Sequence, residues 1–333
     1  MRKTVVVATI VAVVAIGLLA GPAGARRAAG SGGSSDASVR IVNFNVLHGL
    51  FCAPETKACQ ASDRMDLLAQ QLEESECPEV VGMQEVNITI GKELDRIRKT
   101  VCDGKYKIVF GGQPKSSDTE RIFTTLKVKS KKVLKLFGGF RTASRIVLSS
   151  PIGTIVVVTT HQDGDPDEPS LTCRVCKPPC QTDRGVYDCQ TDAAIALANS
   201  AGGANAIRVL MGDFNVDATS ARYAYIIEDG FVDTHFEAGN AECVPETGVN
   251  CTSGRDDQSL AALQDPTTRE SHRIDFIFVK STPKCDVVVD TPDDGDGDGL
   301  GTGLFFPEPT VDGPGGLVWV SDHTGTTADL SCG

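Results

Sequence analysis

Short clusters of carboxylate, amide and imidazole side chains recur along the chain beside apolar stretches rich in β-branched residues. Five of the clusters follow such a stretch, and a sixth opens one. Because rigid scaffolds place reactive groups in the loops at the ends of core strands, we expect the clusters to meet at one edge of the fold. They are Asn43-Phe44-Asn45, Gln84-Glu85, His161, Gly212-Asp213-Phe214-Asn215, His272-Arg273-Ile274-Asp275 and Ser321-Asp322-His323.

Together these clusters would form a pocket with at least three carboxylates, two amides and two imidazoles. Several carboxylates in one pocket ionise at low cost only when a cation neutralises them. Such oxygen ligands suit Mg²⁺, Mn²⁺ or Ca²⁺, whereas zinc would require more histidine or cysteine ligands. The residues therefore predict a hard divalent cation that keeps coordination positions for water and a substrate phosphate.

The elements that must position these clusters are strands and helices intermixed along the chain without a fixed repeat. Hairpins instead of helices join many neighbouring strands, which favours an α/β sandwich of two mixed sheets over a doubly wound parallel sheet. Strands are expected at 39–46, 80–83, 106–110, 154–160, 207–211 and 274–279, with more between 121 and 148, and helices at 65–72, 91–101, 192–199 and 220–228.

The formal net charge of the 333-residue chain is −12. This value excludes a general electrostatic attraction for nucleic acid or anionic membranes at the level of net charge. One segment departs from the balance, with lysines at 127, 129, 131, 132 and 135 followed by Arg141 and Arg145. The segment fits either a solvated strand face or a local phosphate-facing surface near the site, and Arg145 is a candidate phosphate contact.

The first 25 residues have the features of a secretory signal peptide. Met1-Arg2-Lys3 is positively charged, the following run to Ala20 is apolar, and Ala23-Gly24-Ala25 offers a small-residue cleavage site. The apolar run is marginally long enough to span a bilayer, so an uncleaved anchor is the alternative. Residues 26–37 are expected to form a flexible linker and residues 38–333 a single folded domain, so we expect a secreted protein.

Twelve cysteines in an exported chain indicate disulfides more than metal thiolates. Four cysteines between 173 and 189 could alternatively form a zinc knuckle, but export favours disulfides there too. The Asp/Gly tract at 293–303 fits a solvated loop or a calcium loop. The sequence leaves the pairing open, but Cys52/Cys59 and Cys243/Cys251 would each close a short loop, and Cys77/Cys102 and Cys285/Cys332 are candidates for longer closures.

In their order along the chain, the clusters resemble the motifs of the endonuclease/exonuclease/phosphatase superfamily and its deoxyribonuclease I-like members. The resemblance spans nearly the whole predicted domain, from Phe44-Asn45 to Ser321-Asp322-His323. It implies a four-layer sandwich of two central mixed sheets flanked by helices, and hydrolysis of phosphate esters. The chain departs from many relatives between Gly111 and Val133, where a Gly-x-Ala-Ile-Leu-Ser-type strand is missing. This departure bears on the substrate wall and not on the metal centre.

Carried over position by position, the resemblance implies a centre for Mg²⁺, Mn²⁺ or Ca²⁺. Glu85 corresponds to the main metal ligand, with Asn45 beside it and Asp322 close by. A bound metal would polarise a phosphoryl oxygen while side-chain donors stabilise the charge that develops during in-line attack.

The resemblance also implies five catalytic residues. Asp213 and Asn215 would orient the attacking water and the phosphate. His323 would act as general base or as an electrostatic phosphate ligand, with Asp275 holding its imidazole. His161 matches a histidine that can donate a proton to the leaving oxygen. The sequence leaves open which histidine is the base and which is the acid.

These features predict a secreted, metal-dependent phosphodiesterase, with a deoxyribonuclease-like nuclease ahead of a sphingomyelinase-type lipid phosphodiesterase and a phosphatase third. The partner is then a phosphodiester substrate, either nucleic acid or a phospholipid headgroup, and the chain is expected to be a monomer without an obligate protein partner. A lipid enzyme would require an exposed apolar hairpin, for which Val133-Leu134 and Leu136-Phe137 are candidates. A catalytically silent, disulfide-stapled binding protein is the rival, but such a relative would be expected to lose Glu85, Asp213 or His323.

Overall fold

The computed structural model describes residues 37–50, 52, 57–110, 119–137, 141–164, 185–255, 259–291 and 303–333. The predicted signal peptide, the linker up to residue 36, Cys173, Cys176, Cys180 and most of the Asp/Gly tract lie outside these residues. Within the described part of the chain, no helix combines the length and the apolarity that crossing a membrane requires.

Two mixed β-sheets form the centre of the structure. The strands of one sheet are β1 (Ser38–Asn45), β2 (Val80–Gln84), β3 (Lys107–Phe110), β4 (Arg121–Thr124), β11 (Val287–Asp290), β12 (Leu304–Phe305) and β13 (Gly325–Cys332). Those of the other are β5 (Lys127–Lys135), β6 (Thr142–Ser150), β7 (Gly153–His161), β8 (Ile207–Asp213), β9 (Val232–Asp233) and β10 (Asp275–Lys280). The strand orders are β11-β13-β1-β2-β4-β3, with β12 also on β13, and β5-β6-β7-β8-β10-β9.

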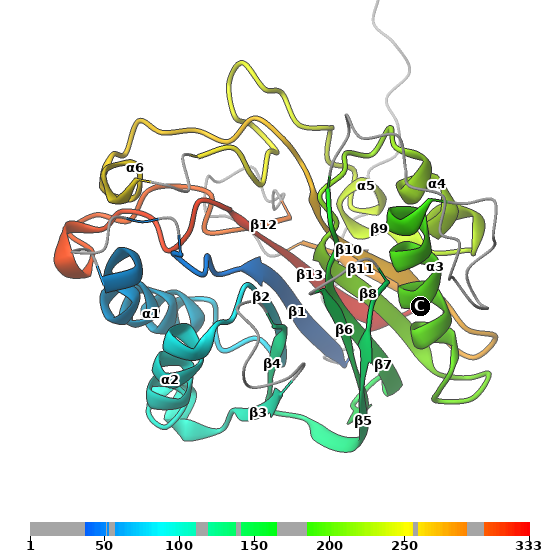
Figure 1. Cartoon of the computed structure of the whole chain (residues 1–333). Helices are drawn as coiled ribbons and strands as arrows, with labels where there is room; N and C mark the ends of the chain where they lie inside the picture. Colours follow the sequence, from blue (N-terminus) through cyan, green and yellow to red (C-terminus); the bar gives the residue numbers. More distant parts are fainter. Residues whose placement is uncertain are drawn as a thin grey trace, which may run out of the picture. The chain divides into compact units, whose positions relative to one another are not determined.

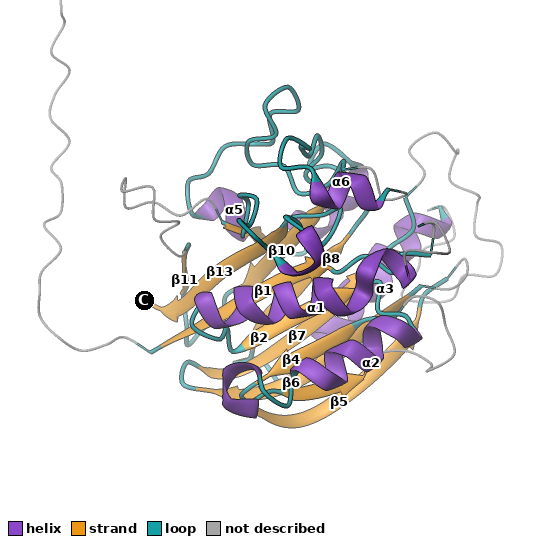
Figure 2. Ribbon diagram, turned by 90° about the vertical axis from the view of Figure 1, so that its left-hand side faces the viewer, coloured by secondary structure: helices purple, strands orange, loops and turns teal. Residues whose placement is uncertain are grey.

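Helices cover the outer face of each sheet, as Figure 1 shows. The helices α1 (Lys57–Glu74) and α2 (Ile88–Ile97) lie on the β1–β2 side, and α3 (Val186–Asn199) and α4 (Ala221–Glu228) lie on the β7–β8 side. Two short helices, α5 (Thr234–Glu237) and α6 (Leu260–Gln264), belong to the longer connections (Figure 2). Separate apolar clusters fill the spaces between α1–α2 and their sheet, between the sheets, and between the second sheet and α3–α4. The predicted four-layer sandwich is confirmed.

Among the described strands, each sheet has one parallel pair, and these two pairs position the site. The strand β1 runs parallel to β2, with Asn45 opposite Gln84 at their carboxyl ends. Likewise β7 runs parallel to β8, with His161 opposite Asp213. Because parallel strands end at the same edge of a sheet, each pair delivers two of the predicted clusters side by side.

Gly212 allows β8 to approach β7 at this edge. Its φ is +154°, and a Cβ added there would lie only 2.0 Å from the Thr160 carbonyl oxygen. That oxygen belongs to the backbone and cannot move aside as a flexible side chain could. A glycine immediately before Asp213 is therefore required by the close strand pairing that places the carboxylate opposite His161.

A buried polar link joins the two sheets beneath the site. Gln84 Nε2 donates to Asn43 Oδ1 at 2.8 Å and to Thr159 Oγ1 at 2.7 Å. Asn43 Nδ2 donates to the Gly212 carbonyl at 3.2 Å. The three side chains are fully buried, and these hydrogen bonds lower the cost of burying them, although Gln84 Oε1 has no partner among the described residues. This link fixes the relative positions of the two parallel pairs.

The four disulfide pairs named from the sequence are confirmed. They are Cys52–Cys59, Cys77–Cys102, Cys243–Cys251 and Cys285–Cys332. Cys189, one of the four cysteines between residues 173 and 189, is also disulfide-bonded.

The expectation that a strand precedes Ser321-Asp322-His323 is wrong. The apolar run 317–320 is a buried connection without strand pairing, and β13 begins only after the motif. The backbone N–H groups of Val318 and Trp319 both donate to the Leu263 carbonyl, next to a core that takes up Leu317 and Val320. Packing alone therefore explains the apolar character of this run.

Candidate active site

The eight site residues predicted from the sequence come from the same edge of the sandwich. Asn45, Glu85, His161 and Asp213 stand at the carboxyl ends of the two parallel pairs. Asp275 is the first residue of β10 and lies opposite Asp213 in an antiparallel register. The remaining three, Asn215, Asp322 and His323, lie in the loops that follow β8 and precede β13.

Asp213 is the centre of the arrangement. Its Oδ2 accepts a hydrogen bond from Asn45 Nδ2 at 3.0 Å and lies 3.5 Å from His161 Nε2 and 3.9 Å from His323 Nε2. Its Oδ1 accepts from the Asn215 backbone N–H at 2.9 Å. One carboxylate, almost completely buried, thus faces both histidines and binds the Asn45 amide and the Asn215 backbone.

Glu85 and Asn45 form the wall of the site on the other sheet. Asn45 Nδ2 lies 3.2 Å from Glu85 Oε1 and 3.3 Å from His323 Nε2, and the Leu47 N–H donates to its Oδ1. Glu85 Oε2 accepts from the His48 N–H at 2.8 Å. The structure thus uses the Asn45 amide nitrogen as a donor toward the site, and its predicted role as a metal ligand stays a prediction.

Backbone conformation places these side chains as much as strand pairing does. Leu47, Glu85 and Asn215 follow β1, β2 and β8, and all three have left-handed φ angles of 55°, 61° and 52°. Non-glycine residues seldom adopt this conformation, and such residues concentrate at functional sites. The repeated turn redirects the chain sharply after each strand, so that polar side chains remain at the edge.

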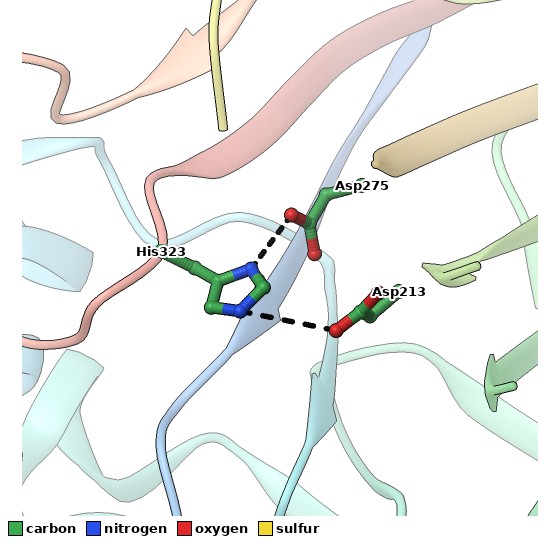
Figure 3. Close-up of side chains that lie close together, drawn as sticks. All are labelled: Asp213, Asp275 and His323. Carbon is green, nitrogen blue, oxygen red and sulfur yellow. Dashed lines mark hydrogen bonds and ion pairs between the residues drawn. The ribbon is translucent and has the colours of Figure 1, made fainter. Parts of the chain in front are cut away.

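His323 is held by a buried carboxylate, as Figure 3 shows. Its Nδ1 lies 2.8 Å from Asp275 Oδ2, and its Nε2 points toward Asp213. Burial alone opposes the charged imidazolium, but Asp275, Asp322 and Asp213 outweigh it and raise the pKa of His323 well above its ordinary value. Burial raises the pKa of Asp275 to about 6, against the opposing pull of His323. The arrangement supports an imidazolium–carboxylate pair at neutral pH.

His161 is held by an arginine. Arg141 Nη1 lies 2.7 Å from His161 Nδ1, and Arg141 Nε donates to Asp163 at 2.8 Å. Because a guanidinium can only donate, Nδ1 must accept, and the neutral imidazole carries its proton on Nε2. That nitrogen faces Asp213 Oδ2 at 3.5 Å, which can accept its proton, whereas Asn215 Nδ2 at 3.0 Å is itself a donor and bonds the Gln162 carbonyl. Arg141 thus selects the tautomer that directs a proton into the site.

The donor set fits a hard divalent cation. Glu85, Asp213, Asp275 and Asp322 supply four carboxylates, of which the last three are buried. Asp213, Asp275 and His323 also form a group whose ligand atoms lie within 4.8 Å of one another. Within this group His323 Nδ1 and Asp275 Oδ2 bond each other, and both oxygens of Asp213 accept hydrogen bonds. Glu85 and Asp322 therefore remain the better ligands. Carboxylate oxygens suit Mg²⁺ or Mn²⁺ more than zinc.

Arg64 holds two loops of the site in place, a role that the sequence did not predict. This fully buried side chain donates to the carbonyls of Val46 and Leu47 after β1 and to that of Val320 before the Asp322 motif. Burial lowers its pKa to about 10, and the charges of Asp322 and Glu85 act in the opposite sense. One cation therefore ties together two motif loops whose carboxylates approach it. No sequence signal distinguishes Arg64 from the other charged residues of α1.

Other basic residues have roles that differ from the expectation. Arg145, a candidate phosphate contact, instead donates to Ser200 Oγ at the end of α3. Arg273, within the Asp275 motif, forms a buried ion pair with Asp233 and a second ion pair with the more exposed Glu242. Arg141, and not Arg145, is the basic residue that lies beside the site. The only sequence signal for it was its membership in the basic segment.

The comparisons with known proteins agree with this geometry. A model of the endonuclease/exonuclease/phosphatase family matches residues 42–323, which include all the predicted site residues. No curated protein matches the chain in sequence. Humanized TDP2 from D. rerio is 17% identical over 88% of this chain and 98% of its own, with a TM-score of 0.61. A mannosyl-6-phosphatase from Bacteroides thetaiotaomicron is 16% identical over 88% and 99%, with a TM-score of 0.57.

A further structure, D. rerio TDP2 complexed with a single-strand DNA product, is 19% identical and covers 89% of this chain and 99% of its own, with a TM-score of 0.60. At these identities the likeness to solved structures shows the shared fold. The family itself rests on the match over residues 42–323.

Proposed function

Since the chain belongs to the endonuclease/exonuclease/phosphatase family and is thus a hydrolase of phosphoester bonds, we propose that it is a metal-dependent phosphodiesterase of the deoxyribonuclease type. The observation that carries the proposal is the convergence of Glu85, Asp213 and His323 on the amide nitrogen of Asn45. These residues come from both sheets and from the C-terminal motif, and carboxylates gathered with an amide and an imidazole fit a phosphate bound together with a divalent cation.

Each side chain then has a chemical task. Asp213 accepts a proton from, and orients, the water that attacks phosphorus. His323, charged and fixed by Asp275, donates to a phosphate oxygen where negative charge develops. His161 donates its Nε2 proton to the leaving oxygen, with Asn215 orienting the phosphate. A divalent cation held by Glu85 and Asp322 would supply Lewis-acid polarisation of the phosphoryl oxygen.

The apolar surface near the site favours a soluble phosphodiester over a membrane lipid. Of the hairpin residues considered for membrane contact, Leu136 is only 3% exposed, Leu134 packs on the α3–α4 cluster and Phe137 packs against Cys189. Val133 alone is exposed, at 42%. Insertion into a bilayer requires a larger contiguous apolar surface, so a sphingomyelinase-type activity has little support among these residues.

We also propose that the protein is exported by its N-terminal segment. Disulfides persist in oxidising compartments and are rare in the reducing cytosol. The four disulfide pairs of the described residues support this proposal. Mass spectrometry of the mature N-terminus after secretion from a suitable host would test it, with processing near Ala25 as the expected result.

The activity is tested by a substrate panel of plasmid DNA, RNA, sphingomyelin and bis(p-nitrophenyl) phosphate, each with Mg²⁺ and with chelator. Turnover of a nucleic acid and of the chromogenic diester is expected, with loss in chelator and in Asp213→Ala. Arg208→Met is the matched control, because Arg208 lies on the same strand but binds the Ala206 and Gly203 carbonyls at its opposite end. Absence of turnover on every substrate would favour the silent binding protein.

A further inference from the structure

The edge strand β5 concentrates positive charge that the catalytic site does not use. Between residues 121 and 162 the sequence contains eight Lys and Arg residues and no Asp or Glu, although the whole chain has a net charge of −12. Five of the eight are lysines of β5, and all five side chains are exposed. They are Lys127, Lys129, Lys131, Lys132 and Lys135.

No carboxylate within the described chain neutralises these five lysines. Lys129 Nζ donates to the Thr154 hydroxyl at 2.9 Å, an uncharged partner. Lys132 lies directly opposite Arg145 on β6, and like charges in this cross-strand position destabilise a sheet. The strand therefore keeps a repulsive charge density that a bound polyanion would relieve.

The position of β5 connects this charge to the catalytic site. The strand lies at the outer edge of its sheet, and no described strand pairs with its free side (Figures 1 and 2). Its last residue, Lys135, leads into the hairpin in which the Leu136 N–H donates to the Arg141 carbonyl at 3.0 Å. Arg141 in turn contacts His161. The lysines of β5 thus extend from the hairpin beside the site along the whole edge strand.

We propose that β5 binds the phosphate backbone of a nucleic-acid substrate and extends the substrate path away from the catalytic centre. The proposal rests on the phosphodiesterase function proposed above. At a rise of about 3.3 Å per residue the nine-residue strand is ~26 Å long. One strand of duplex DNA places about eight phosphates along this length. Lysine contacts to phosphates carry no base specificity, so the strand supplies affinity and orientation for any sequence.

Two other roles would explain exposed lysines on an edge strand. Lysines protect a free edge from pairing with other chains, and clusters of lysine attract anionic lipid surfaces. The first role requires neither an approach to the hairpin beside Arg141 nor five lysines without an ion-pair partner among the described residues. Binding to a lipid surface has little additional support, because Val133 is the only exposed large apolar side chain of β5. Nucleic acid is therefore the occupant that the observations favour.

The test compares two triple variants of the full chain that lose the same charge. Lys129→Gln/Lys131→Gln/Lys132→Gln removes the centre of β5, and Lys92→Gln/Lys99→Gln/Lys105→Gln removes three exposed lysines from the α2 side. Binding of a labelled 12-nucleotide strand and of its duplex is measured by fluorescence anisotropy in EDTA at several salt concentrations. Turnover of bis(p-nitrophenyl) phosphate and size-exclusion chromatography are measured in parallel.

For the β5 variant we expect oligonucleotide affinity to fall at least about tenfold and the slope of log K against log salt to flatten by about 0.9 per lost duplex contact. Turnover of the small diester should stay within about twofold of wild type, and the α2 variant should bind as wild type does. Equal losses in both variants would overturn the proposal, since net charge alone would then explain binding. Unchanged binding with new aggregation would assign β5 to edge protection.

Binding of wild type to vesicles containing phosphatidylglycerol, without binding to the oligonucleotides, would also overturn it in favour of a lipid surface. A different result would contradict the proposed catalytic function. In that case the wild-type protein would not hydrolyse bis(p-nitrophenyl) phosphate with Mg²⁺, whatever the anisotropy measurements show.

Discussion

A histidine lies on each side of Asp213, and the two imidazoles are held by groups of opposite charge. On one side His323 has a carboxylate behind its Nδ1, and on the other side His161 has a guanidinium behind its Nδ1. The carboxylate favours a charged ring, whereas the guanidinium fixes a neutral tautomer with its proton on Nε2. Chemistry at a phosphate requires both a fixed positive charge and a transferable proton, and the two supports assign these tasks to different histidines.

The largest effect is expected where the two sides meet. Asp213→Asn keeps the volume of the side chain but removes the charge that faces both imidazoles and accepts from Asn45. Turnover of bis(p-nitrophenyl) phosphate should fall toward the upper end of the range of about 10²–10⁴-fold for a lost general base. A decrease smaller than tenfold would place the chemistry elsewhere.

A comparison of the histidines themselves sharpens the assignment. His323→Gln removes the stabilising charge and should lower kcat by about 10³-fold on every diester. His161→Gln should cost about 10² with a poor leaving group, and much less with p-nitrophenolate, which leaves without a proton. The ratio of rates on a methyl and on a nitrophenyl diester measures this difference. Equal ratios for both variants would contradict the separate roles.

The groups behind the histidines should have smaller effects. Asp275→Asn and Arg141→Met each remove a partner that orients an imidazole, and such outer contacts typically contribute about 10–100-fold. Asp275→Asn should have the larger effect because it also removes the charge that supports the imidazolium. Arg208→Met serves again as the control, and circular dichroism checks that each variant is folded. A larger loss of activity in Arg141→Met than in Asp275→Asn would contradict the roles assigned to the two histidines.

The smallest effect is a change in pH dependence. The His323–Asp275 pair requires an ionised Asp275, whose pKa is raised to about 6 by burial. The carboxylate is therefore lost as pH falls through about 6, and the wild-type rate should decline there. His323, whose pKa is raised, loses its charge only as pH rises. In Asp275→Asn the acid limb near pH 6 should disappear and the alkaline limb should move to lower pH. Stopped-time assays between pH 4.5 and 9 would detect both shifts.

The sequence predicted the site more completely than the connections around it. The residues at strand ends, such as Asn45 and Asp213, could be predicted because a β-branched run followed by polar residues has a specific structural meaning. The run 317–320 has a similar composition, but it packs in the core without pairing. Composition cannot separate these cases, because both bury apolar side chains.

The residues that support the site were harder to predict. Arg64 and Arg141 act through backbone carbonyls and a histidine ring that lie far away in sequence. An arginine on a helix or in a hairpin has the same local pattern whether it faces solvent or a buried loop. Only the packing of α1 against the β1 loop, and of the β5–β6 hairpin against β7, distinguishes them.

The central claim is that this edge of the sandwich hydrolyses phosphodiesters with a divalent cation. Initial rates on bis(p-nitrophenyl) phosphate test it most directly, measured for the full chain in Mg²⁺, in EDTA, and in EDTA followed by excess Mg²⁺, with Glu85→Gln alongside. The account predicts turnover that EDTA abolishes and Mg²⁺ restores, and a higher Mg²⁺ requirement in Glu85→Gln. An undiminished rate in EDTA, or no turnover with Mg²⁺, Mn²⁺ or Ca²⁺, would contradict it.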